Sequence, residues 1–361
     1  MHRADEVNAK AWAAFAVVVV AALGATVGPA ASEEAAPDGI EIVDVPLIAW
    51  VTSRAHALAD SLVNFTTADG RTEQFREFIE KLATLDRTKA AELAKDLHYQ
   101  LVEIDEDGKK YLVASDDSGS GRDPTIVINT APARDIILEA PHVPFEFGTA
   151  EQAVILLRDL DGVAALVSGA HRCASKSFTA CDGKTEVCTP GTQRQFPDSD
   201  AGHNTRTLFH TAHLVLADHW NKAIVVSLHG MGDDNDGVRT SLIISDGARA
   251  EDLDRTHPAT KLRVAMEDVA APGKVVSCNL LADEQHEAPP LCGFTNIQGR
   301  NVNGDADECR DSVDQGTGRF IHMEQDKILR KPYAQNWSHI EDDAFAKRLV
   351  EAFKSVVPAN P

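Results

Sequence analysis

From Pro124 onward, short apolar runs alternate with longer amphipathic stretches. Runs rich in Val, Ile and Leu predict buried strands, and apolar residues at three- and four-residue intervals predict helices. The predicted strands are 125–129, 135–140, 163–168, 222–228, 240–244, 274–278 and 319–324, and the predicted helices are 149–160, 204–220, 260–269 and 341–356. For helix 149–160, Thr149 is the predicted N-cap and Gln152 its capping-box partner. This alternation favours an α/β fold with a mixed, largely parallel central sheet and helices on both faces.

Residues 32–120 have a different pattern. Apolar periodicity predicts helices at 50–62, 73–82 and 88–97, and a β-hairpin follows at 99–104 and 110–115 around the turn Asp105-Glu-Asp-Gly. Residues 116–123 have the composition of a linker. We therefore expect a helical and hairpin N-terminal region over 32–120 and an α/β catalytic domain over 121–361.

The start of the chain predicts export. Residues 1–31 begin weakly basic and continue into an apolar stretch that ends in small residues, as a secretory signal peptide does. An uncleaved N-terminal anchor is the alternative, because the apolar stretch is long for a signal peptide. Residues 32–38 have the composition of a tether.

Six cysteines agree with a secreted or periplasmic protein, since an even number in an exported chain predicts three disulfides. We expect one bridge within 173–188 and one from Cys292 to Cys309. The net charge of −21 argues against nucleic acid and against an anionic membrane surface as partners, because both require basic patches.

Polar residues follow several of the predicted strands. They are His142 with Glu146, His171 with Arg172, His229, and Glu324. The carboxyl ends of strands in an open α/β sheet meet at one edge, so these residues can share a site. Two histidines and one carboxylate suit a catalytic zinc ion, and a further carboxylate can transfer protons. Taken singly, each residue also fits a polar strand-end turn or a surface ion pair.

A metal-independent serine hydrolase is a weaker alternative. His229-Gly230-Met231-Gly232 resembles an oxyanion loop of the α/β-hydrolases, whose nucleophile lies in a G-x-S-x-G turn. No G-x-S-x-G occurs in the chain. The sequence therefore disfavours this alternative.

Four short motifs occur together in order. They are Pro141-His142 with Glu146, Gly148-Thr149 and Gln152; Val226-Ser-Leu-His229-Gly230; Asn296-Ile-Gln-Gly-Arg300; and Gly318-Arg-Phe-Ile-His-Met-Glu324 with Arg330. Together they resemble the motifs of poly-γ-glutamate hydrolases, which are zinc enzymes with a carboxypeptidase-like fold, and of the wider group of zinc carboxypeptidases and N-formylglutamate amidohydrolases. The resemblance covers roughly residues 124–356.

The resemblance implies a role for each matching residue. It implies that His142, Glu146 and His229 bind Zn²⁺ and that Glu324 is the general base and acid. It makes Arg172, Asn204, Asn296 and Arg300 candidates for holding a substrate carboxylate or the oxyanion.

Two departures from the family pattern affect this assignment. Glu146 follows His142 at i+4, where carboxypeptidases use i+3, so Glu139 is a second candidate ligand. Val143-Pro144-Phe145 also replaces the family's glycines, which argues against carrying over the substrate.

The sequence therefore predicts an exported zinc-dependent hydrolase that cleaves an amide or peptide bond. The expected partner is a small peptide or amide substrate that carries a carboxylate, such as a cell-wall peptide or a γ-linked or N-acylated amino acid. A secreted, non-catalytic binding protein on the same scaffold is the alternative from another class.

Overall fold

The computed structural model describes residues 39–54, 56, 58, 69–232, 240–268, 273–280 and 291–360. The predicted signal peptide or anchor and the predicted tether lie outside these residues. Within the described part of the chain, no helix is both long and apolar enough to cross a bilayer.

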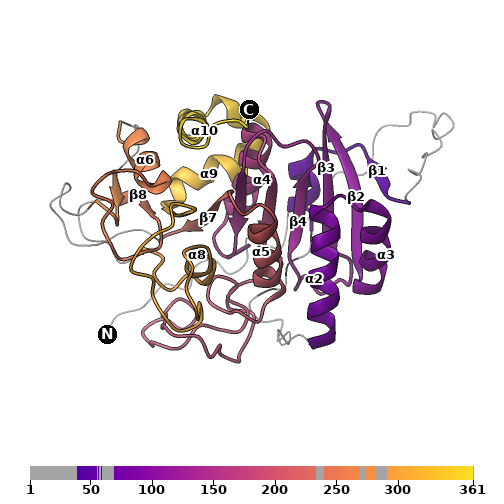
Figure 1. The fold of residues 1–361 in the computed structure, drawn as a ribbon, viewed down its shortest axis with the longest axis horizontal. Helices are drawn as coiled ribbons and strands as arrows, with labels where there is room; N and C mark the ends of the chain where they lie inside the picture. Colours follow the sequence, from indigo (N-terminus) through magenta and orange to yellow (C-terminus); the bar gives the residue numbers. More distant parts are fainter. Residues whose placement is uncertain are drawn as a thin grey trace, which may run out of the picture. The chain divides into compact units, whose positions relative to one another are not determined.

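The described residues form one ten-stranded sheet and its covering helices (Figure 1). The strands are β1 (Glu41–Val43), β2 (Tyr99–Glu106), β3 (Lys109–Asp116), β4 (Thr125–Asn129), β5 (Ile136–Ala140), β6 (Ala164–Val167), β7 (Ile224–Gly230), β8 (Thr240–Ser245), β9 (Lys274–Ser277) and β10 (Phe320–Gln325). The helices are α1 (Leu47–Thr52), α2 (Asp69–Ala83), α3 (Arg87–Leu97), α4 (Thr149–Leu160), α5 (Leu208–His219), α6 (Pro258–Ala265), α8 (Ile297–Val302), α9 (Lys327–Asn336) and α10 (Ala344–Val356), with a 3₁₀ helix η1 at Trp337–Asp342.

The sheet is mixed, as the sequence predicts. Its strand order is β1-β2-β3-β4-β6-β5-β7-β10-β8-β9. The central strands β6, β5, β7 and β10 are parallel to one another, whereas β3, β4 and β8 each pair antiparallel with a neighbour. The carboxyl ends of the four central strands therefore meet at one edge of the sheet.

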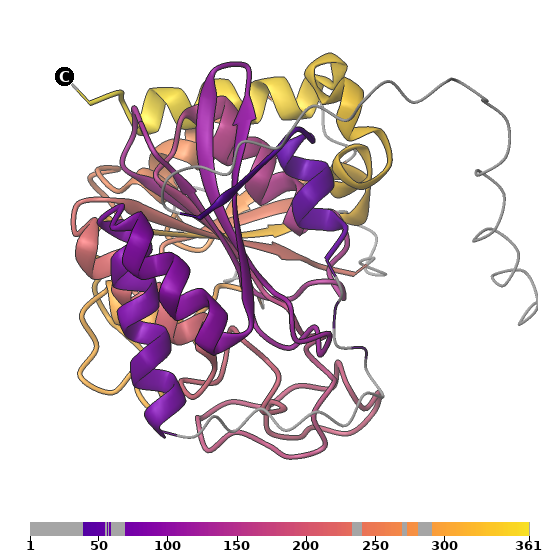
Figure 2. The same cartoon turned by 90° about the vertical axis from the view of Figure 1, so that its right-hand side faces the viewer.

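Helices cover both faces of the sheet (Figure 2). Helices α1, α4, α6, α9 and α10 pack on one face, and α2, α3 and α5 pack on the other. Side chains alternate between these layers along each strand: in β5, Leu138 belongs to the first core and Ile137 to the second. The α/β fold with helices on both faces is confirmed.

The N-terminal hairpin extends this sheet. Strands β2 and β3 pair around Asp107 and Gly108, both with positive φ, which explains the Gly in the predicted turn. β3 then pairs with β4 across the predicted boundary near residue 120, so residues on both sides share one sheet. Helix α3 lies close to its prediction, and α2 begins four residues earlier than predicted. Helix α1 ends at Thr52 and so overlaps only the start of the predicted helix 50–62, part of which lies outside the described residues.

Several helix starts differ from the predictions. The N-cap of α4 is Gly148, with φ +85°, rather than Thr149, whose hydroxyl donates to the Glu146 carbonyl. Gln152 binds Gln325 instead of closing a capping box. Helix α5 begins at Leu208 because Thr207, not Asn204, accepts a hydrogen bond from the His210 amide. Helix α10 likewise begins three residues later than predicted, behind the N-cap Asp343.

Three disulfides join the loops, and one predicted pairing is correct. Cys173 bonds to Cys188, as expected. The predicted bridge from Cys292 to Cys309 is wrong, because Cys292 bonds to Cys278 and Cys309 bonds to Cys181. Proximity in sequence misleads here, since the packing of loops from distant parts of the chain decides which sulfurs meet.

Two of the three disulfides close loops of very different length and should therefore differ in their effect on stability. Cys181–Cys309 spans 128 residues and Cys173–Cys188 spans 15. Loop-closure entropy gives about 5 kcal/mol for the long loop and about 3 kcal/mol for the short one. Replacing Cys181 and Cys309 by Ser should therefore lower the free energy of unfolding, measured in urea, more than replacing Cys173 and Cys188. Equal losses would contradict this expectation.

Candidate metal centre

Polar side chains form layers on the α5 face of the sheet, toward the carboxyl ends of β5, β7 and β10. The parallel register aligns Ile137, Val225 and Phe320 in one apolar layer and Glu139, Ser227 and His322 in the next. His229 and Glu324 are partners in the third layer, at the ends of β7 and β10. His142 and Glu146 lie in the turn between β5 and α4.

His142, Glu146 and His229 converge, and all three are buried. The His142 Nδ1 atom lies 2.8 Å from Glu146 Oε1 and 3.1 Å from His229 Nδ1. The His229 Nδ1 atom lies 3.4 Å from Glu146 Oε2. One ligand atom from each residue falls within 4.8 Å of the others, so the group could hold a metal ion.

The donor set fits a metal ion because the outer nitrogens of both rings already have partners. His142 Nε2 lies 2.9 Å from Asp200 Oδ1, and an ionised carboxylate can only accept, so this nitrogen carries the proton. Metal binding would require the ring to be neutral, and Nδ1 would then present its lone pair to the cluster. His229 Nε2 lies 2.9 Å from Ser227 Oγ. A histidine ligand is typically oriented in this way through its other nitrogen.

The ionisation of the cluster follows from its burial and charges. Burial and Arg172 would lower the pKa of His142, but the Glu146 and Asp200 carboxylates outweigh them and raise it to about 9. Burial lowers the pKa of His229 to about 4; the Glu146 carboxylate opposes this shift, and the charges of His142 and Arg172 add to it. Burial opposes the charge of Glu146, yet the two histidines hold its pKa well below the usual range. Glu146 is therefore an anion at neutral pH.

Glu324 is the second carboxylate of the centre, and its pKa shifts in the opposite direction from that of Glu146. Burial, and then the charge of Glu146, raise the pKa of Glu324 to about 8. Its neighbour His322 lies 3.9 Å away and stacks on the His229 ring. His229, His322 and Glu324 form a further group whose ligand atoms could hold a metal ion.

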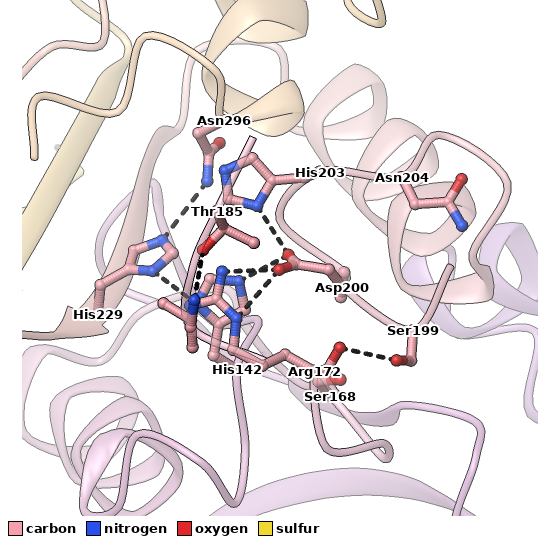
Figure 3. Close-up of polar contacts among 12 residues, drawn as sticks. His142, Ser168, Arg172, Thr185, Ser199, Asp200, His203, Asn204, His229 and Asn296 are labelled. Atoms are coloured by element: carbon pink, nitrogen blue, oxygen red, sulfur yellow. Dashed lines mark hydrogen bonds and ion pairs between the residues drawn. The ribbon is translucent and has the colours of Figure 1, made fainter. Parts of the chain in front are cut away.

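Arg172 and Asp200 border the cluster on one side (Figure 3). Arg172 Nη2 lies 2.6 Å from Asp200 Oδ2, and its Nη1 lies 3.1 Å from Glu146 Oε1. Asp200 also bonds to His203 Nδ1 at 2.7 Å. Burial would raise the pKa of Asp200, but Arg172, His203 and His142 hold it well below the usual range. This network orients His142 and neutralises the buried carboxylates.

The structure separates the four predicted substrate-binding residues. Arg172 touches the cluster, and Asn296 Nδ2 lies 3.4 Å from His229 Nε2. Asn204 instead donates to the Asp198 carbonyl, and Arg300 binds Asp182 with both terminal nitrogens. Arg172 and Asn296 therefore belong to the centre, whereas Asn204 and Arg300 have partners in the surrounding loops.

The alternative ligand Glu139 has another partner. It lies inside β5, one layer deeper than His229, and its Oε1 is 2.8 Å from His213 Nδ1 of α5. Both side chains are fully buried. Among the described residues, the groups that could hold a metal ion include Glu146 and leave out Glu139.

Sequence reasoning did not identify Asp200, His203, Ser227 and His322. Asp200 and His203 lie in a long loop with no motif, so no local signal marks them. Ser227 and His322 each precede a predicted site residue by two positions, and strand periodicity places them on the same face. That signal could have found both.

No protein-family model matches the chain, and no curated protein matches its sequence. Among solved structures, the chain is similar to gene product Atu2144 from Agrobacterium tumefaciens, with 11% sequence identity and a TM-score of 0.38. The similarity covers 65% of this chain and 95% of that chain. A likeness at this level carries no conclusion about function, so the chemistry of the centre rests on its own residues.

Loss of the Asp200 charge should lower the stability of the fold. Asp200→Asn removes the carboxylate that pairs with the buried Arg172 guanidinium, so the free energy of unfolding should fall by about 3–5 kcal/mol. The matched control is Asp159→Asn, which removes the partner of a half-exposed arginine, Arg158, and should cost at most about 1 kcal/mol. Denaturant unfolding measures both, and equal effects would show that Asp200 is not an essential countercharge.

Proposed function

We propose that this protein is an exported, zinc-dependent hydrolase that cleaves an amide or peptide bond. The observation that carries the proposal is the convergence of His142 Nδ1, His229 Nδ1 and the Glu146 carboxylate beside a fourth group, Glu324. Two histidines and one carboxylate leave a coordination position open, as catalytic zinc sites do. The order of the sequence motifs, which resembles that of poly-γ-glutamate hydrolases and zinc carboxypeptidases, supports the same conclusion.

His142, Glu146 and His229 would hold the ion. Zinc supplies Lewis acidity, which polarises an amide carbonyl and lowers the pKa of water. Imidazole nitrogens and a carboxylate suit zinc better than calcium or magnesium, which prefer all-oxygen sites. Asp200 and Ser227 would keep the two rings oriented through their outer nitrogens.

Glu324 would transfer a proton between the attacking water and the leaving amine. With a pKa of about 8, its carboxyl group holds a proton at neutral pH, which it can deliver to the nitrogen of a leaving amine. A zinc ion held by the cluster would add positive charge that lowers this pKa, and the ionised carboxylate could then accept a proton from water. A carboxylate whose pKa lies near the working pH is suited to both steps.

We propose as substrate a small peptide or amide that carries a carboxylate, such as a γ-glutamyl compound, a cell-wall peptide or an N-acylated amino acid. Arg172 and Asn296 are the candidates at the centre for contacting it. The three disulfides support an oxidising compartment, which agrees with the predicted export.

Metal analysis tests the site directly. Protein purified without chelator should contain about one zinc ion per chain, and His142→Ala and His229→Ala should each lose it. His219→Ala is the control, because His219 is an exposed histidine at the end of α5. A metal-free parent protein that also fails to bind added zinc would refute the proposed function.

Glu324→Gln tests the proton transfer. The variant keeps the shape of the side chain but cannot ionise, so it should retain zinc and lose about 10²–10⁴-fold in hydrolysis rate. The assay would use a panel of γ-glutamyl, N-acyl-amino-acid and cell-wall peptide amides, and Glu341→Gln, at an exposed carboxylate, is the control. Full activity of Glu324→Gln would remove Glu324 from the mechanism.

A further inference from the structure

One guanidinium group connects the three chain segments that carry the centre. Arg330, in α9, donates from Nη1 to the Phe147 carbonyl at 2.6 Å, from Nε to the Gln325 carbonyl at 3.1 Å and from Nη2 to the Met231 carbonyl at 3.4 Å. These carbonyls follow Glu146 and Glu324 by one residue and His229 by two.

Two glycines pack closely against Arg330, one against its backbone and one against its guanidinium. A Cβ atom at Gly230 would lie 2.2 Å from Arg330 Cζ, so any larger residue directly after His229 would require the guanidinium to move. Gly148, with φ +85°, places its Cα so that a Cβ would lie 2.6 Å from the Arg330 carbonyl oxygen. The segments after His229 and after Glu146 are therefore both shaped around Arg330, which is itself buried.

The chemistry of arginine explains why one residue can serve three segments. Its planar guanidinium offers five N–H donors in a rigid fork, whereas the lysine ammonium is a point charge on a flexible stem. A buried cation that loses its hydrogen bonds pays a large desolvation cost, so the three carbonyls and the guanidinium hold one another in place.

We infer that Arg330 is the positioning residue of the centre: by binding the carbonyls after Glu146, His229 and Glu324, it fixes the mutual placement of these three side chains. Its effect on metal affinity rests on the proposed function. Its effect on the placement of the segments does not, so the two can be tested separately.

Backbone hydrogen exchange tests the placement without metal. The Gly230 amide donates to Glu146 Oε2 at 2.9 Å and so reports the contact between two of the segments. In Arg330→Met this amide should exchange at least about tenfold faster, the factor that corresponds to losing one charge-assisted hydrogen bond. Arg319→Met is the matched control, since Arg319 also donates to two backbone carbonyls, Ala217 and Ala223, but outside these segments. Unchanged exchange at Gly230 in folded Arg330→Met would overturn the inference.

A second variant covers the case in which Arg330→Met does not fold. Gly230→Ala keeps the guanidinium but forces it away from its carbonyls, so it should accelerate exchange at residues 146–148 in the same way. Exchange at these residues equal to that of the parent would again overturn the inference.

Zinc titration against a competing chelator measures the functional consequence. Arg330→Met should bind zinc about 10–100-fold more weakly than the parent, the usual cost of losing an outer-shell partner, while Arg319→Met should bind it normally. Added guanidinium should restore part of the affinity of Arg330→Ala. Normal zinc affinity in folded Arg330→Met would overturn the positioning role, whereas a parent that binds no zinc would refute the proposed function and leave the exchange result to decide the role of Arg330.

Discussion

The candidate centre depends on the parallel register of β5, β7 and β10. Side chains that are partners in neighbouring strands point to the same face, so three strands far apart in sequence build common layers. An apolar layer anchors the sheet against α5, and each later layer becomes more polar. A shift of one residue in the register of β7 or β10 would place His229 or Glu324 on the opposite face of the sheet, away from the other residues of the site.

Burial of this much charge needs compensation, which Arg172 and the histidines provide. Arg172 pairs with Asp200 and contacts Glu146, and the two histidines of the cluster hold Glu146 ionised, while Arg330 binds backbone carbonyls beside the cluster. Because opposite charges lie within hydrogen-bond distance, Glu146 and Asp200 remain ionised although they are buried. Glu324 has no such close cation among its described contacts, and burial together with the charge of Glu146 raises its pKa. One cluster thus contains both an anionic ligand and a proton carrier.

Much of the fold could be predicted because strands and helices leave local signals. The strands from β4 to β10 lie close to their predicted positions, and His142, Glu146, His229 and Glu324 were identifiable because each lies at or just after a strand end. Helix starts were less predictable: α5 begins at Leu208 rather than at 204, because the Thr207 side chain accepts the capping hydrogen bond. The pairing of Cys309 with Cys181 and of Arg300 with Asp182 left no local trace.

The sequence by itself therefore determined the α/β class, the alternation of the central elements and the polar residues at the strand ends, because these follow from periodicity along the chain. Only the tertiary structure decided which of those residues meet. It placed Asp200 behind His142, directed Glu139 to His213 and brought Arg330 to three separate segments. Loop packing and strand register make these contacts, and both depend on residues distant in sequence, which no local pattern records.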